Sequence, residues 1–126
     1  MGYRSEVVLV VGKEVMPQFM VTMAKSIEAR ALCFADHDKM IKDYEEEGNL
    51  LFAWDAIKWY DSYECIGTLE SFIEEASADE YEFEVDGKAE ASSDHIRFVR
   101  VGEESDDIEL RGDGFWDIYP STSINY

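Results

Sequence analysis

The chain has 126 residues and a mass of 14.5 kDa, enough for one domain with its own hydrophobic core. Apolar residues make up 46% of it, so the composition excludes an intrinsically disordered chain. Its 29 acidic and 11 basic side chains give a formal net charge of -18, which disfavours direct binding to DNA, RNA or an anionic membrane surface. No apolar run is long enough for a membrane span, and the N-terminus lacks a secretory-signal pattern, so we expect a cytosolic protein.

Nothing in the chain indicates a second domain. No internal repeat and no linker rich in Pro, Gly or Ser interrupts it, so residues 1–126 are predicted to form a single α+β domain. The two cysteines, Cys33 and Cys65, are too few for a disulfide scaffold. Each lies in a helix-like pattern, which predicts buried thiols.

The first third of the chain predicts a strand followed by helix. Residues 7–11 are a β-branched run, typical of a central strand that is covered on both faces. From Met16 to Phe34, apolar residues recur every three or four positions, which predicts an amphipathic helix that begins near Val15, with Pro17 in its first turn. Residues 34–38 indicate a break, and residues 40–47 a second short helix that ends at Gly48.

The middle of the chain predicts a second strand and a second amphipathic helix. Residues 50–59 are rich in aromatic and aliphatic side chains, which favours a strand, although a helix stays open there. Asp61 or Ser62 can cap the helix that follows. Its predicted buried stripe consists of Ile66, Leu69, Phe72 or Ile73, and Ala76.

The last third predicts short strands that pair as antiparallel hairpins. Residues 81–85 alternate apolar and acidic side chains before a turn at Asp86-Gly87, and residues 96–101, 108–110 and 115–119 also favour strands. The predicted fold is α+β: a two-layer sandwich of a mainly antiparallel sheet with two or three helices on one face. Strand order stays open, and a ferredoxin-like split unit fits the same pattern.

The negative charge is concentrated in two stretches. Residues 43–87 carry 15 acidic side chains and one basic, and residues 101–126 carry seven acidic and one basic. Residues 1–42 have a net charge of +1. Because crowded carboxylates repel one another without improving the packing, the acidic stretches favour a role in binding. The competing interpretation is a solvated surface that keeps the protein soluble.

The sequence contains no convincing catalytic or metal-binding motif. His37 lies between Asp36 and Asp38, but three neighbouring residues cannot all point at one ion. Ser92, Asp94 and His95 are likewise too close in sequence for a catalytic triad. The stretch 103–109 resembles a calcium loop in charge only. We therefore expect a protein that is not an enzyme, with no cofactor and no metal.

Three stretches resemble a group of small acidic proteins encoded by bacteriophages and prophages. They are residues 1–7, residues 58–63 (KWYDSY) and residues 97–108. The resemblance implies a phage accessory protein that acts in the cytoplasm of the host cell, and it assigns no catalytic residue. Small acidic phage proteins include anti-restriction and anti-CRISPR inhibitors, several of which mimic nucleic acid.

Charge and resemblance together predict a non-enzymatic inhibitor with a surface that mimics nucleic acid. Its partner would be a host protein with a basic nucleic-acid-binding groove, such as a defence complex. The expected partner-binding residues are the carboxylates on a shared helix face, on one strand face and in the last acidic stretch: Glu70, Glu74, Glu75, Glu82, Glu84, Glu103, Glu104, Asp106 and Asp107. The aromatic residues expected to anchor the partner are Trp59, Tyr60, Tyr63 and Tyr81.

Two alternatives stay open at this point. One is a domain that binds a small molecule or a divalent cation, with the aromatic stretch 52–63 lining a pocket and nearby carboxylates holding a cationic ligand. The other is a structural or virion-associated acidic module. The oligomeric state is left open.

Overall fold

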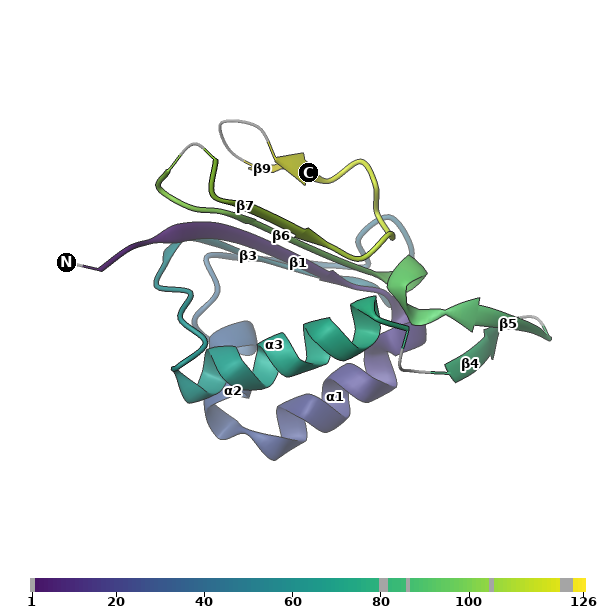
Figure 1. Cartoon of the computed structure of the whole chain (residues 1–126). Coiled ribbons are helices and arrows are strands. Elements are labelled where there is room, and N and C mark those ends of the chain that lie inside the picture. The colour runs from purple at the N-terminus through teal and green to yellow at the C-terminus, as the bar shows by residue number, and fades with distance from the viewer. Residues whose placement is uncertain (1, 80–81, 86, 105, 121–123) are drawn as a thin grey trace.

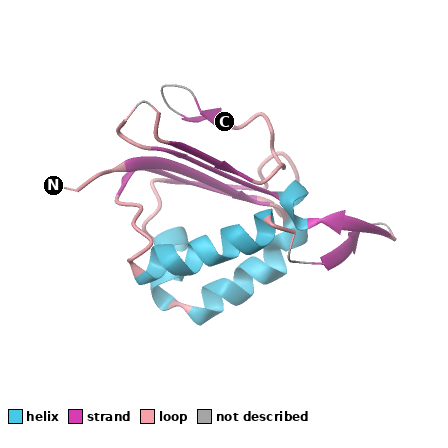
Figure 2. Cartoon of the chain, in the orientation of Figure 1, coloured by secondary structure: helices cyan, strands magenta, loops and turns pink. Residues whose placement is uncertain are grey.

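A computed structural model of the whole chain describes residues 2–79, 82–85, 87–104, 106–120 and 124–126. Five antiparallel strands form the main sheet in the order β2-β3-β1-β6-β7. They are β1 (Ser5–Val11), β2 (Lys39–Lys42), β3 (Leu50–Ile57), β6 (Ile96–Val101) and β7 (Ile108–Arg111). The helices α1 (Met16–Lys25), α2 (Ile27–Phe34) and α3 (Glu64–Ser77) cover one face of this sheet (Figures 1 and 2). The predicted α+β fold is confirmed.

Strand β1 lies at the centre of the sheet, as its β-branched run predicts. Residues 7–11 are all fully buried. Alternate side chains point to opposite faces, so Val7 contributes to the core beneath the helices, and Val8 to a second core on the other face. Both neighbours of β1 run antiparallel to it, which excludes the ferredoxin-like alternative because that arrangement pairs its two central strands in parallel.

The helix-side core is built from the predicted stripe of α3 and from aromatic rings. Ile66, Leu69, Phe72, Ile73 and Ala76 are all buried, so the predicted stripe is confirmed and includes both position 72 and position 73. Aromatic rings from α1 and β3 pack on the same core. No helix in the described residues is long and apolar enough to cross a lipid bilayer.

The predicted helix from Val15 to Phe34 is wrong in one respect, because Ser26 divides it. Ser26 has an extended backbone (φ -143°, ψ 114°), which ends α1 and begins α2. Its hydroxyl oxygen accepts a hydrogen bond from the Ala29 amide at 3.0 Å, and the hydroxyl donates to Glu64 Oε2 at 2.8 Å. Serine is a preferred N-cap residue, so a local signal existed. The apolar periodicity continues across the cap and conceals it.

The short helix predicted over 40–47 is also wrong, because residues 39–42 form the edge strand β2. Met40 pairs with Phe52 and Ile41 with Leu51. The connection to β3 turns back sharply, with positive φ at Asp43, Glu45 and Gly48. Three apolar positions are too few to specify a helix, and pairing with β3 decides the conformation.

The connection between β3 and α3 differs in detail from the prediction. Strand β3 ends at Ile57, which confirms a strand in this region but not its extension to Trp59. Helix α3 begins at Glu64 with Tyr63 as its N-cap residue, so neither Asp61 nor Ser62 caps it. Residues 58–63 therefore form a loop that crosses from the sheet to the helix layer.

The second face of the sheet is covered by the C-terminal segment. Ile118 and Ile124 are buried there against Val8, Val10 and other β1, β3 and β6 residues. The guanidinium of Arg97 holds the segment in place by donating to the main-chain oxygens of Ile118 and Gly112. The strand predicted over 115–119 is wrong except at its end, because β8 is Tyr119–Pro120 and pairs with β9 (Ile124–Asn125).

A separate hairpin projects from the end of α3, on the right in Figure 1. It consists of β4 (Glu82–Val85) and β5 (Lys88–Ala91), and a short 3₁₀ helix, Ser92–His95, returns the chain to β6. A second 3₁₀ turn, Lys13–Val15, joins β1 to α1. The predicted antiparallel hairpins are thus present. Tyr81 and Asp86, expected at this hairpin, lie outside the described residues.

Candidate functional site: a polar groove beside an acidic turn

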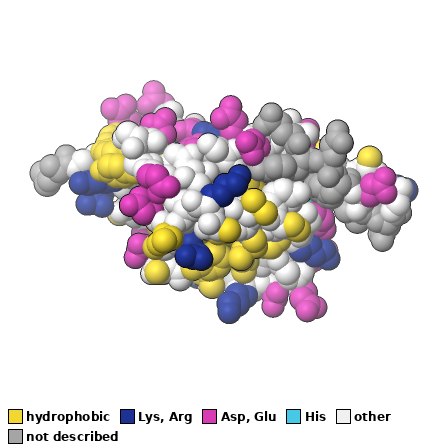
Figure 3. Space-filling model, turned by 90° about the horizontal axis from the view of Figure 1, so that it is seen from below, with side chains coloured by type: hydrophobic (Ala, Val, Ile, Leu, Met, Phe, Trp, Pro, Cys, Tyr) yellow, Lys and Arg dark blue, Asp and Glu magenta, His cyan; other side chains and the backbone are white. Residues whose placement is uncertain are grey.

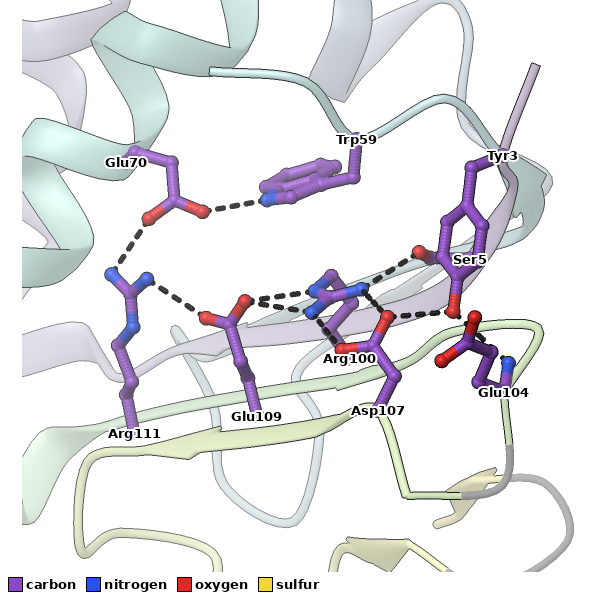
Figure 4. Close-up of polar contacts among 9 residues, drawn as sticks. All are labelled: Tyr3, Ser5, Trp59, Glu70, Arg100, Glu104, Asp107, Glu109 and Arg111. Carbon is purple, nitrogen blue, oxygen red and sulfur yellow. Dashed lines mark hydrogen bonds and ion pairs between the residues drawn. The ribbon is translucent and has the colours of Figure 1, made fainter.

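A groove of about 900 Å³ opens between α3, the 58–63 loop, the N-terminal segment and the strands β6 and β7. Its lining is polar and aromatic: Tyr3, Ser5, Trp59, Tyr60, Asp61, Ser62, Glu70, Glu74, Ser77, Arg100, Asp107, Glu109 and Arg111. Five of these side chains are acidic and two are basic, so the groove has an excess of negative charge. Figure 4 shows the contacts that organise it.

Arg100, on β6, is the centre of the groove's ion pairs. Its Nη2 lies 2.6 Å from Asp107 Oδ1, and its Nε and Nη2 each lie 2.9 Å from Glu109 Oε1. Its Nη1 donates to Ser5 Oγ at 3.0 Å and to Asp107 Oδ2 at 3.1 Å. These bonds engage every nitrogen of the guanidinium (Figure 4). The bond to Asp107 raises the pKa of Arg100, and the same contact lowers the pKa of Asp107.

Arg111, on β7, extends the ion pairs to α3. Its Nη2 lies 2.9 Å from Glu109 Oε2 and its Nη1 lies 2.6 Å from Glu70 Oε2. Glu70 Oε1 also accepts a hydrogen bond of 2.7 Å from the Trp59 indole Nε1. Burial lowers the pKa of Arg111, but the nearby carboxylates of Glu70 and Glu109 outweigh it and leave the pKa raised. One continuous network therefore joins the sheet, the helix and the 58–63 loop.

Tyr3 connects the N-terminal segment to the turn between β6 and β7. Its hydroxyl donates to Asp107 Oδ2 at 2.7 Å and accepts from the Glu104 amide at 3.0 Å, while its own amide donates to Tyr60 Oη at 2.7 Å. The Glu104 amide lowers the pKa of Tyr3, but desolvation and the Asp107 carboxylate outweigh it, so the pKa is raised. These contacts attach the N-terminal segment to the β6–β7 turn and to the 58–63 loop at one end of the groove.

The strand register explains why these charges meet. Arg100 pairs with Glu109, and Phe98 pairs with Arg111, across the β6–β7 ladder. Directly paired residues point to the same face of a sheet, so both arginines and Glu109 face the helix layer. The Arg111 guanidinium lies 5.3 Å from the centre of the Phe98 ring, a cation–π arrangement that further fixes its position.

The structure separates the nine predicted partner-binding residues. Glu70 and Asp107 point into the groove and are engaged by arginines. Glu74 is exposed on the groove wall, whereas Glu75 lines a different hollow beside α1. Glu70 and Glu74 thus share a surface, as helix spacing predicts, and Glu75 does not lie on it.

The remaining predicted residues lie at opposite ends of the molecule. Glu103, Glu104 and Asp106 are exposed in the β6–β7 turn, next to the groove. Glu84 is exposed on the β4–β5 hairpin at the far end (Figure 1). Glu82 lies on the same strand, and its side chain is outside the described part. The two acidic stretches therefore share only part of their surface. Glu70 and Glu74 of the first stretch line the groove next to the β6–β7 turn of the second, whereas the β4–β5 hairpin lies far from it.

The aromatic residues named from the sequence also divide. Trp59 and Tyr60 line the groove, and Tyr63 is 44% exposed close by. Phe52 and Trp54, which the alternative hypothesis also puts in a pocket, are buried in the core. Trp59 is half-buried and packs on Trp54 and Phe98, so it serves the core and the groove at once.

Sequence reasoning missed the residues that organise the groove: Arg100, Arg111, Glu109 and Tyr3. A signal existed in β7, where Glu109 and Arg111 alternate with apolar residues and so share one face of the strand, which is the face toward the helix layer. An inward charge on a strand requires a partner, because an unpaired charge is costly to bury. Only the register and the position of α3 identify that partner.

A second acidic hollow, of about 710 Å³, lies near the other end of β1. Its lining includes Glu14, Glu45, Asp117, His95 and the exposed Trp116. His95 Nδ1 lies 3.2 Å from Glu14 Oε1, so this histidine is held by carboxylates. Contact with Asp117 raises the pKa of Glu45. Within the described residues, no group of three or more His, Cys, Asp or Glu side chains is placed to hold a metal ion.

The histidine motifs have structural partners. His37 Nδ1 lies 2.8 Å from the Cys33 carbonyl oxygen, and Asp38 accepts a hydrogen bond from the Asp55 amide. Ser92, near His95 in sequence, is buried and donates its hydroxyl to the Ala76 carbonyl oxygen. These contacts account for the residues as local structural elements.

Comparison of the chain with protein-family models, with curated proteins and with solved structures found no match.

Proposed function

We propose that this protein is a non-enzymatic inhibitor whose acidic surface occupies the basic nucleic-acid-binding groove of a partner protein. The partner class is a nucleic-acid-acting complex of a host cell. A defence system is the target suggested by the resemblance to small acidic phage proteins, and the site of action would then be the host cytoplasm.

The observation that carries this proposal is that the excess negative charge lies at the surface. The buried polar residues of the described chain are serines, a threonine and an asparagine, with no carboxylate among them. Two of the chain's 11 basic side chains, Arg100 and Arg111, are engaged by carboxylates inside the groove, and Arg97 is engaged by main-chain oxygens. The excess of carboxylates in the described part of the chain therefore faces solvent, where it attracts a cationic surface and increases the rate of encounter.

The surface that we propose for contact is the β6–β7 turn together with the adjoining groove wall. The turn presents Glu103, Glu104 and Asp106, and the wall adds Asp61 and Glu74. The internal network holds this surface rigid, because Tyr3 and Arg100 fix the base of the turn through Asp107. A rigid set of spaced carboxylates can replace phosphates in a basic groove at a low cost in conformational entropy. The exposed ring of Tyr63 offers a nearby aromatic anchor.

The experiment begins with capture from a bacterial lysate on the immobilised chain, followed by elution in steps of rising salt. Each captured protein that binds nucleic acid is then tested by fluorescence anisotropy for displacement of a labelled DNA duplex. We expect displacement that weakens as salt rises. A triple variant, Glu103→Gln, Glu104→Gln and Asp106→Asn, should weaken displacement about tenfold or more.

The matched control changes the net charge by the same amount at another exposed turn. It is the triple variant Glu45→Gln, Glu46→Gln and Glu47→Gln, which should alter displacement by less than about twofold. Equal losses in the two variants would reduce the effect to net charge and overturn the proposed surface. Captured proteins that keep their DNA duplex in the presence of the chain would overturn the mimicry itself.

A second candidate function follows from the composition of the groove. Trp59 and Tyr60 provide aromatic surface, and Asp61 and Glu74 provide carboxylates without a described cation partner. This combination suits a small cationic ligand. A thermal shift with Ca²⁺, Mg²⁺ or a small organic amine that Glu74→Gln abolishes would favour this function over inhibition.

A further inference from the structure

The outer face of α1 and α2 carries an apolar patch. Pro17, Met20, Val21, Ala24 and Ile27 are all exposed, with 48% of Met20, 56% of Val21 and 76% of Ile27 accessible to solvent. The spacing of the first four places them on one side of α1, opposite its buried stripe, and Ile27 begins α2 next to them. Figure 3, which views the helix side, shows hydrophobic side chains gathered at the centre of this face. Contiguous exposed apolar surface of this kind is typical of an interaction site.

The charge around the patch differs from that of the rest of the molecule. Residues 16–34 carry Lys25, Arg30 and only one acidic side chain, Glu28. Figure 3 shows basic side chains beside the hydrophobic centre and acidic ones mainly toward the ends. Two molecules of charge -18 repel each other over most of their surfaces. This face is where two copies can meet without placing carboxylates against carboxylates.

We propose that two copies of this chain form a dimer through this face, with α1 of one copy antiparallel to α1 of the other about a twofold axis. The dimer does not depend on the proposed inhibitory function. The axis passes beside Val21 and Ala24, so these two small side chains of each copy meet at the centre. Such an interface uses the same surface twice, as most dimers do.

The antiparallel arrangement also matches the surface along α1. Met20 and Lys25 are five residues apart, about 7.5 Å along the helix, and are equidistant from the axis. Met20 of each copy therefore lies beside the hollow of about 250 Å³ that Pro17, Gln18, Val21, Thr22, Lys25 and Glu75 line on the other. The exposed methionine covers part of a hollow that is otherwise open to water.

The same arrangement brings opposite charges together across the axis. Lys25 and Glu75 both line the hollow beside α1, and both are exposed in the single chain. In the dimer, the ammonium group of Lys25 from the second copy can therefore approach the carboxylate of Glu75.

The first test is the mass in solution, measured by light scattering after size exclusion at about 100 µM chain. We expect twice the chain mass of 14.5 kDa. Ile27→Glu should give a monomer, because symmetry buries the new carboxylate twice. The side chain is mostly exposed in the single chain and begins a helix, where glutamate is favourable, so the fold should be retained. Leu110→Glu, at a residue 46% exposed on β7, is the matched control and should remain a dimer.

The second test probes the register. An oxidised mixture of the Met20→Cys variant and the Lys25→Cys variant should form disulfide-linked pairs, and neither variant should do so alone. Rising salt should strengthen the dimer, because it screens the repulsion between two acidic bodies. A mass of one chain for the wild type, a dimer that survives Ile27→Glu, or one that Leu110→Glu dissociates would each overturn the proposal.

Discussion

Replacement of Arg100 by methionine tests whether the groove's ion pairs hold this end of the protein together. The Arg100 side chain is only 12% exposed, and its nitrogens engage Asp107, Glu109 and Ser5. Arg100→Met keeps the length of the side chain but leaves Asp107 without its cation. Hydrogen bonds to charged groups contribute about 1.5–3 kcal/mol each when buried, and partial exposure of the partners reduces this. We expect a loss of about 2–3 kcal/mol in the free energy of unfolding, measured by urea denaturation at neutral pH.

The control is Arg30→Met, because Arg30 is exposed on α2, and its replacement should change stability by less than about 0.5 kcal/mol. Acidification gives an independent readout. The folded pKa of Asp107 is lowered, so its stabilising contribution is present above the ordinary carboxyl pKa of about 3.9 and is lost as pH falls through the folded value. The difference between wild type and Arg100→Met should therefore shrink at low pH. A variant within about 0.5 kcal/mol of wild type at neutral pH would refute the reasoning.

Three further outcomes are expected. Contact with Glu64 raises the pKa of Glu28, and contact with Asp117 raises the pKa of Glu45, so the folded state binds protons more readily than the unfolded state. The urea concentration at the unfolding midpoint should therefore rise as pH falls from 7 toward about 5, and the double variant Glu28→Gln/Glu45→Gln should reduce that rise. Burial raises the pKa of the Cys33 thiol to about 12, so mass spectrometry should find it unmodified by iodoacetamide at about pH 8 in the folded protein and modified after unfolding. Gly112→Ala should cost about 1–3 kcal/mol in urea denaturation because φ is +84° and the new methyl group meets a main-chain oxygen of β6, whereas Gly87→Ala, at φ +78° in open space, should cost clearly less.

Local patterns were sufficient where the apolar residues of an element mark its whole buried surface. The unbroken run at residues 7–11 identified a central strand buried on both faces, and the spacing of Ile66, Leu69 and Ala76 identified the buried side of α3. In both segments the pattern of apolar residues follows the pattern of burial, so the sequence alone contains the answer. The net charge of -18 and its uneven distribution are likewise properties of the sequence.

Local patterns failed where the decisive partner is distant in the chain. The strand at residues 39–42 depends on pairing with β3, and the division at Ser26 depends on a cap whose hydroxyl also bonds Glu64 on α3. The C-terminal segment lies on the second face of the sheet, held by Arg97. Short polar or mixed segments carry little intrinsic preference, so tertiary contacts choose their conformation.

The candidate site shows the same division most clearly. The sequence determined that carboxylates are abundant, but not which of them face solvent. Asp107 and Glu70 turn inward because the β6–β7 register and the position of α3 place Arg100 and Arg111 beside them, whereas Glu103 and Glu104 stay exposed only a few residues away. Tyr3 reaches Asp107 across 104 positions of the chain. Charges act through space, so their pairing is decided by the assembled fold rather than by their order in the sequence.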